Sequence, residues 1–169
     1  MNSYLIKIFI FFVSMTFPTE NDFIGKHISK FPSAALGSDH GYKKDYRIVG
    51  DFAYLGKPYE ILFLFTDKND IVQSYDILFE GDIDRAFYNL MIKKYGNPDS
   101  IVNIKNISES ATSIDENGIS AKQFIGKLME CSFDENPFLI KWIENKIEIR
   151  FDLKKPDAPF KKTIIHFGN

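Results

Sequence analysis

The sequence predicts an α+β protein, with a mainly antiparallel sheet of about seven strands and about three helices packed on one face. Short β-prone runs separated by turn-forming residues are typical of hairpins, and they supply the strands. Three other stretches repeat their apolar residues at the spacing of an amphipathic helix. The chain has 169 residues, and about 150 remain without an N-terminal segment, which is the usual size of one domain.

The N-terminal segment has the layout of a secretory signal. Lys7 supplies a basic n-region, and the following run at 8–17 is apolar apart from one serine and one threonine. This run is well short of the ~20 residues that a membrane-spanning helix requires. We therefore expect a cleaved signal peptide at 1–17, with a boundary between 16 and 20, and one periplasmic or secreted domain at 18–169. A buried strand and an uncleaved anchor are the alternatives for the run.

The first half of the domain is predicted to contain a short helix followed by strands. Asn21 or Asp22 can cap a helix that continues to about Phe31, because Pro32 ends it. The strands expected in this half are 46–49, 52–55, 59–66 and 71–79. The last two flank the turn-forming sequence DKND, so we expect them to form a hairpin.

The second half is predicted to contain two longer helices. Asp82 is the expected cap of the first, which Gly96 and Pro98 stop. Ser120 and Gln123 form a capping-box pattern in front of the second apolar stripe. Strands are expected at 101–104, 138–144, 147–153 and 162–167, and an exposed loop at 106–118. Alternation in 147–153 places its charged residues on one face and its apolar residues on the other.

A helix that exits through KYGNP at 94–98 and a lone Trp142 on a late strand resemble features of small exported bacterial α+β domains. The beta-lactamase-inhibitor-protein-like fold is the nearest named architecture, and the likeness concerns the order of the elements. The resemblance implies an α+β arrangement and identifies no activity.

Composition and motifs disfavour several classes of function. A net charge of −2 and a pI near 5.9 argue against nucleic-acid binding, which needs a basic surface. The single cysteine, Cys131, excludes an internal disulfide and a multi-cysteine metal site. The histidines, His27, His40 and His166, lack the i, i+4 spacing of a zinc-binding helix, and structural roles are the simpler interpretation. We expect no cofactor, no metal and no membrane anchor after signal removal.

Catalysis is not expected from any single residue. Ser38, Asp39 and His40 are the residue types of a hydrolase triad, but neighbours in sequence rarely point at one another, so a turn is the better interpretation. Cys131 ends an apolar stripe, where a thiol behaves as a small hydrophobic group. An enzyme would have to assemble its site from residues distant in sequence.

Two segments combine lysine pairs with aromatic residues, which suits contact with an acidic protein partner. The candidate partner-binding residues are Tyr42, Lys43, Lys44, Lys154, Lys155 and Phe160. Solvated loops with ordinary surface lysines are the alternative interpretation. The sequence thus favours an exported, soluble binding or inhibitory module that acts by protein–protein contact. A small exported enzyme, hydrolase-like, is the alternative function.

Overall fold

A computed structural model of the protein describes residues 23–114, 120–151 and 162–168. These residues form one nine-stranded sheet, one α-helix, α1 (Arg85–Tyr95), and the 3₁₀ turns η2 (Ile28–Lys30) and η3 (Phe133–Glu135). The strands are β1 (Ala35–Asp39), β2 (Lys43–Tyr54), β3 (Lys57–Asp67), β4 (Val72–Glu80), β5 (Ser100–Ile114), β6 (Ser120–Glu130), β7 (Leu139–Trp142), β8 (Ile147–Phe151) and β9 (Lys162–Gly168).

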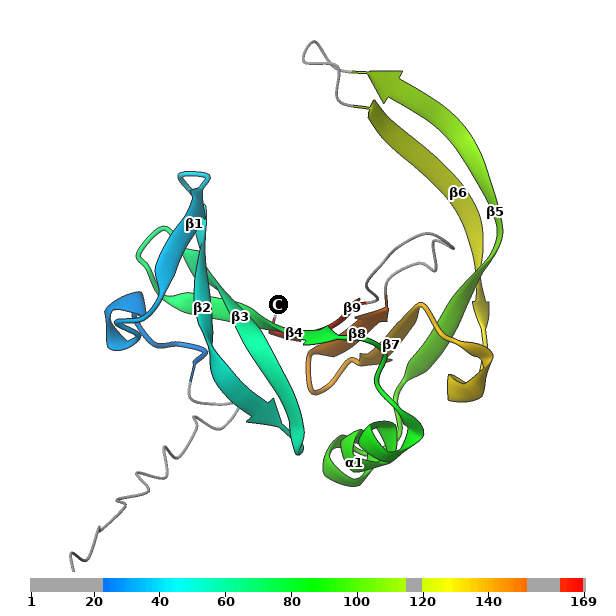
Figure 1. Cartoon of the computed structure of the whole chain (residues 1–169), viewed down its shortest axis with the longest axis horizontal. Helices are drawn as coiled ribbons and strands as arrows, with labels where there is room; N and C mark the ends of the chain where they lie inside the picture. Colours follow the sequence, from blue (N-terminus) through cyan, green and yellow to red (C-terminus); the bar gives the residue numbers. More distant parts are fainter. Residues whose placement is uncertain (1–22, 115–119, 152–161, 169) are drawn as a thin grey trace, which may run out of the picture.

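The sheet has the strand order β1-β2-β3-β4-β9-β8-β7-β5-β6, and all of its described strand pairs are antiparallel. Strands β1 to β4 form a meander. The chain then passes through α1 to the far edge of the sheet, where β5 and β6 form a long hairpin that projects from the body (Figure 1). Strands β7, β8 and β9 return towards the middle, so the last strand pairs with β4.

The predicted arrangement of about seven strands with three helices is wrong, because the described residues contain nine strands and one α-helix. The first predicted helix is instead a turn followed by η2. Gly25 has φ +80°, which an α-helix does not use, and its N–H donates to the carbonyl of Val72. The N–H of Ile28 likewise donates to the carbonyl of Asp70, 2.8 Å away. Hydrogen bonds to the start of β4 therefore replace those of a helix.

The helix predicted from Ser120 is strand β6, because β5 supplies its backbone partners from Val102 to Ile114. A different capping box is present at η3, where the Ser132 N–H donates to the Glu135 carboxylate. The loop predicted at 106–118 belongs mainly to β5, and 115–119 lie outside the described residues.

Other predicted elements are confirmed. The hairpin of β3 and β4 turns at 67–70, where Asp67 accepts hydrogen bonds from the N–H groups of Asn69 and Ile71. Helix α1 is present, but its cap is Asp84, which accepts a 2.8 Å hydrogen bond from the N–H of Phe87. The alternation predicted for 147–153 holds over the five residues of β8.

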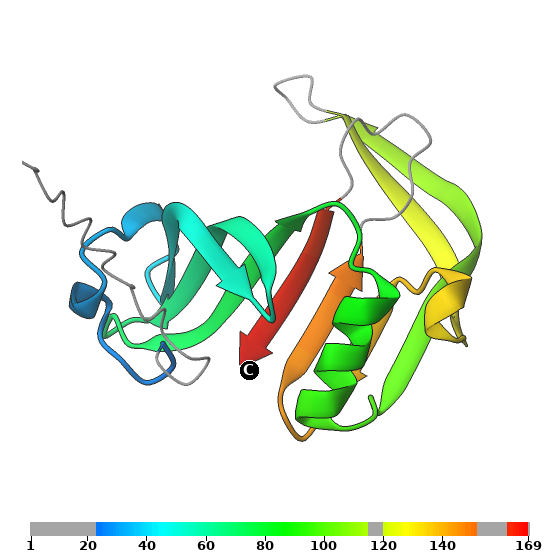
Figure 2. The same ribbon diagram turned by 60° about the horizontal axis from the view of Figure 1, so that its bottom comes forward.

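Helix α1 packs against one face of the sheet, over its middle strands (Figure 2). The buried residues of the helix are Phe87, Tyr88 and Met91. The Phe87 ring packs edge-on against Phe79 of β4, with centroids 5.5 Å apart. Trp142 of β7 is 1% exposed, and its indole N–H donates to the carbonyl of Gly96, 2.9 Å away. The hydrophobic core therefore lies between α1 and the middle strands.

The opposite side of the sheet, which we call the distal face, carries the alternate residues of the same strands. In register, Asp76 of β4 lies beside His166 of β9, and His166 lies beside Glu148 of β8. The distal-face residues of the central strands are Phe63, Phe65, Asp76, Leu78, Glu148, Arg150, Ile164 and His166. Charged and aromatic groups therefore share this face.

Candidate binding cleft on the distal face

A cleft of about 440 Å³ opens on the distal face, where parts of the chain distant in sequence meet. It is lined by Tyr42, Lys43, Phe65, Thr66, Asp67, Gln73, Ser74, Asp76, Arg150 and His166. These residues come from the turn before β2 and from β2, β3, β4, β8 and β9. The pairing of β4 with β9 is what brings the C-terminal strand to this place.

The β1–β2 turn presents Tyr42 at one side of the cleft. Asp39 accepts a 2.7 Å hydrogen bond from the N–H of Gly41, and the N–H of His40 donates to the carbonyl of Lys43. This tight turn leaves Tyr42 71% exposed. The Lys43 ammonium lies 5.9 Å from the centroid of the Tyr42 ring, within range of a cation–π contact. An aromatic ring and a cation are thus held together.

A row of polar side chains crosses the distal face from β4 to β7. His166 Nδ1 lies 2.6 Å from the Asp76 carboxylate. Glu148 accepts hydrogen bonds from Lys141, at 2.7 Å, and from Arg150, at 2.9 Å. Burial acts to raise the pKa of Glu148, but the hydrogen bonds and positive charges of these two neighbours lower the pKa below its ordinary value. Glu148 is therefore held as a carboxylate that orients Arg150.

The cleft combines satisfied carboxylates with accessible cations. Asp67 accepts hydrogen bonds from turn N–H groups and from Gln73, and Asp76 is paired with His166. The Arg150 side chain is 51% exposed and has N–H groups beyond those that bond Glu148. The chemistry of the cleft therefore suits a ligand that brings its own negative charge and an apolar surface for the aromatic rings.

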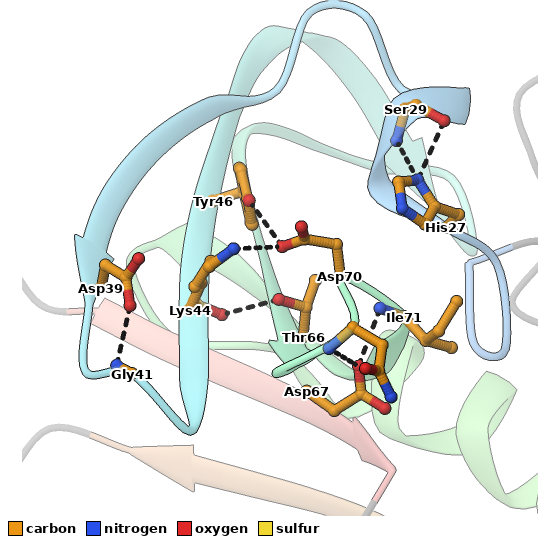
Figure 3. A network of polar contacts seen from close by, with 11 residues as sticks. His27, Ser29, Asp39, Gly41, Lys44, Tyr46, Thr66, Asp67, Asp70 and Ile71 are labelled. Carbon is orange, nitrogen blue, oxygen red and sulfur yellow. Dashed lines mark hydrogen bonds and ion pairs between the residues drawn. The ribbon is translucent and has the colours of Figure 1, made fainter.

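The candidate residues predicted from sequence separate into three groups. Tyr42 and Lys43 line the cleft. Lys44 instead forms a 2.8 Å ion pair with Asp70, which also accepts a hydrogen bond from the hydroxyl of Tyr46 (Figure 3). The hydrogen bond from Lys44 lowers the pKa of Asp70, and the same bond raises the pKa of Lys44. Lys44 thus stabilises the β3–β4 turn.

The remaining candidates, Lys154, Lys155 and Phe160, lie outside the described residues. The segment that contains them is flanked by Phe151 of β8 and Lys162 of β9.

The sequence-based site did not include most of the cleft residues, among them Asp76, Arg150 and His166. The alternation of β8 shows that Glu148 and Arg150 share a face, and this was the available signal. The register between β4, β9 and β8 decides which residues join them. No local pattern contains that register, because it arises from strand pairing between distant segments.

The other candidate catalytic residues have structural surroundings. His27 accepts a hydrogen bond from the N–H of Ser29 at the start of η2, next to the β3–β4 turn (Figure 3). Burial raises the pKa of the Cys131 thiol, which disfavours the nucleophilic thiolate. Within the described ranges, no group of three or more His, Cys, Asp or Glu side chains is placed to hold a metal ion.

No protein-family model, curated protein or solved structure matches the chain. No helix in the part of the chain that the structure describes has the length and apolar character needed to cross a membrane. The described residues form a nine-stranded antiparallel sheet with a helix on one face and a polar, aromatic cleft on the other.

Proposed function

We propose that the chain is an exported binding module that acts by contact with a protein partner, and that the distal-face cleft is its binding site. The observation that carries the proposal is the meeting of Tyr42, Lys43 and Arg150 at one cleft. Tyrosine and arginine are the residue types that most often dominate protein–protein binding energy. Export to a periplasm or to the exterior is part of the proposal and depends on the signal-like segment at 1–17.

The proposed contact places an acidic side chain of the partner between Lys43 and Arg150, with an apolar group against Tyr42. Arg150 already bonds Glu148 through Nε and Nη2, at 3.2 and 2.9 Å, so less side-chain freedom is lost when it binds. Lys43 supplies long-range attraction that speeds encounter with a negatively charged partner. The module would then bind or inhibit its partner without chemical change to either molecule.

A pair of charge reversals tests the proposal. Lys43→Glu alters the cleft, whereas Lys93→Glu makes the same change of net charge on α1, across the sheet. We expect envelope proteins captured by immobilised wild-type protein to be lost or reduced about tenfold with Lys43→Glu and retained with Lys93→Glu. The loss should shrink as salt rises, because the attraction is screened. Equal capture by both variants would overturn the proposal.

A small exported hydrolase is a second candidate, because the cleft contains a histidine–carboxylate pair. Asp76 bonds Nδ1 of His166, the arrangement that orients an imidazole so that Nε2 can act as a general base. The purified protein should then turn over ester or peptide substrates, and His166→Ala should abolish turnover while Lys93→Glu does not. Absence of turnover by the wild-type protein leaves the binding module as the proposed function.

A further inference from the structure

Strand β6 lies at one end of the sheet, with β5 as its neighbour and no described strand on its other side. It is 11 residues long, whereas β1 at the other end has five. The bulges of the hairpin lie on β5. Between the pair Lys105–Lys127 and the pair Ser108–Ile125, β5 advances by three residues and β6 by only two, so the extra residue belongs to β5. Strand β6 is therefore a long edge without an inserted residue.

The direction of the edge hydrogen-bonding groups follows from one contact. The N–H of Cys131 donates to the carbonyl of Ile101, 3.0 Å away, so Cys131 points its backbone groups towards β5. Neighbouring residues in a strand point these groups to opposite sides. The even-numbered residues from Ser120 to Glu130 therefore direct their N–H and C=O groups to the outer edge, where a further strand can pair.

We infer that β6 pairs antiparallel with β6 of a second copy of this chain, with the two-fold axis at Gly126. A two-fold axis perpendicular to the sheet places a residue opposite its own counterpart. With Gly126 at the axis, Lys122 falls opposite Glu130 of the second copy, and Phe124 falls opposite Leu128. Opposite charges and apolar pairs at directly opposed positions stabilise antiparallel strands. Both pairings occur twice in the dimer.

The charges select this register over its symmetric alternatives. Strand β6 contains one glutamate, Glu130, and two lysines, Lys122 and Lys127. Two-fold symmetry opposes only positions whose numbers are both even or both odd, so Glu130 can face Lys122 but not Lys127. If the two-fold axis were at Lys127, this lysine would lie directly opposite Lys127 of the second copy, and the two like charges would repel. The axis at Gly126 is thus the symmetric register that sets lysine directly opposite glutamate.

In the inferred register Leu128, which is 57% exposed in the single chain, gains an apolar neighbour in Phe124 of the second copy. Pairing of the β6 edges closes both of them and leaves the short β1 strands as the ends of a continuous sheet.

Charge exchange tests the dimer and its register. Sedimentation equilibrium of the purified exported chain should show a dimer, and Lys122→Glu or Glu130→Lys alone should raise the dissociation constant about tenfold. The double variant, Lys122→Glu with Glu130→Lys, should restore wild-type association because the pairs are re-formed with exchanged signs. Circular dichroism establishes that each variant is folded. A wild-type monomer, or a double variant weaker than both single ones, overturns the inference.

A disulfide supplies a second test that uses the native cysteine. In the inferred register Ala121 lies opposite Cys131 of the second copy, as a non-hydrogen-bonded pair with Cα atoms about 4.5 Å apart, within disulfide range. Mild oxidation of Ala121→Cys should give a covalent dimer. Gln123→Cys, opposite Met129, is the matched control and should give much less. Equal yields from the two variants contradict the register.

Discussion

On one side of the sheet, α1 covers aromatic and aliphatic side chains, whereas on the other side β4, β9, β8 and β7 present a row of charged groups. Trp142 and Phe79 represent the first side, with at most 1% of either residue exposed. Arg150 and Tyr42 represent the second, where side chains keep contact with solvent. The same strands build both faces through their alternation. The comparison indicates that stability depends mainly on the α1 face, which leaves the distal face as the place of the proposed recognition.

The largest expected effect is from Trp142→Ala. Removal of the indole leaves a cavity beneath α1 and takes away the donor to the carbonyl of Gly96, so we expect a loss of about 3–5 kcal/mol in the free energy of unfolding. Urea denaturation measures it. Tyr42→Ala, on the distal side, should change stability by less than about 0.5 kcal/mol. Similar losses in the two variants would remove the distinction between the faces.

A smaller effect is expected at the cap of α1. Asp84→Ala removes the acceptor for the N–H of Phe87 and should cost about 1 kcal/mol of unfolding free energy. Asp84→Asn retains a side-chain oxygen and is the matched control, with a cost of a few tenths of a kcal/mol. Both values come from urea unfolding curves. Indistinguishable curves for Asp84→Ala and wild type would show that this cap does not hold the helix on the sheet.

The smallest stability effect concerns Glu148, whose folded-state pKa is lowered by Lys141 and Arg150. Because folding lowers the pKa, the ionised carboxylate stabilises the fold at pH values above its pKa in the unfolded chain, about 4.3. This contribution is lost as the pH falls through the pKa of the folded protein. Wild type should exceed Glu148→Gln by less than about 1 kcal/mol at pH 7. The difference should shrink as the pH is lowered below about 4.3, within the same urea assay. A difference that grows on acidification would contradict the sign.

The sequence identifies elements whose local pattern permits one interpretation. The DKND sequence between two β-prone runs fits a hairpin turn and no other element. Helix α1 has both an apolar stripe at helical spacing and a glycine that ends it. Strand β6 is different, because apolar residues at 124, 125, 128 and 129 fit a helix face as well as a strand. Pairing with β5 decides the outcome, and that contact is not encoded in the local spacing.

The candidate site shows the same division. Tyr42 and Lys43 stand out as an exposed aromatic and basic pair in a glycine-containing turn, and both line the cleft. Asp76 and His166 are 90 residues apart in sequence, so their contact depends on the β4–β9 pairing. Lys44 differs from Lys43 only in the face of β2 that it occupies. That alternation places it beside Asp70 instead of in the cleft.

Site-specific photo-crosslinking in cells of the native host tests the central claim, that the distal face binds a protein partner, most directly. A benzophenone amino acid replaces Tyr42 in one variant and Leu90 of α1 in the other, both exposed but on opposite sides of the sheet. The account predicts a discrete higher-mass adduct from position 42 that Lys43→Glu weakens, and no such adduct from position 90. An adduct from position 90 alone, or equal adducts from both positions, would contradict it.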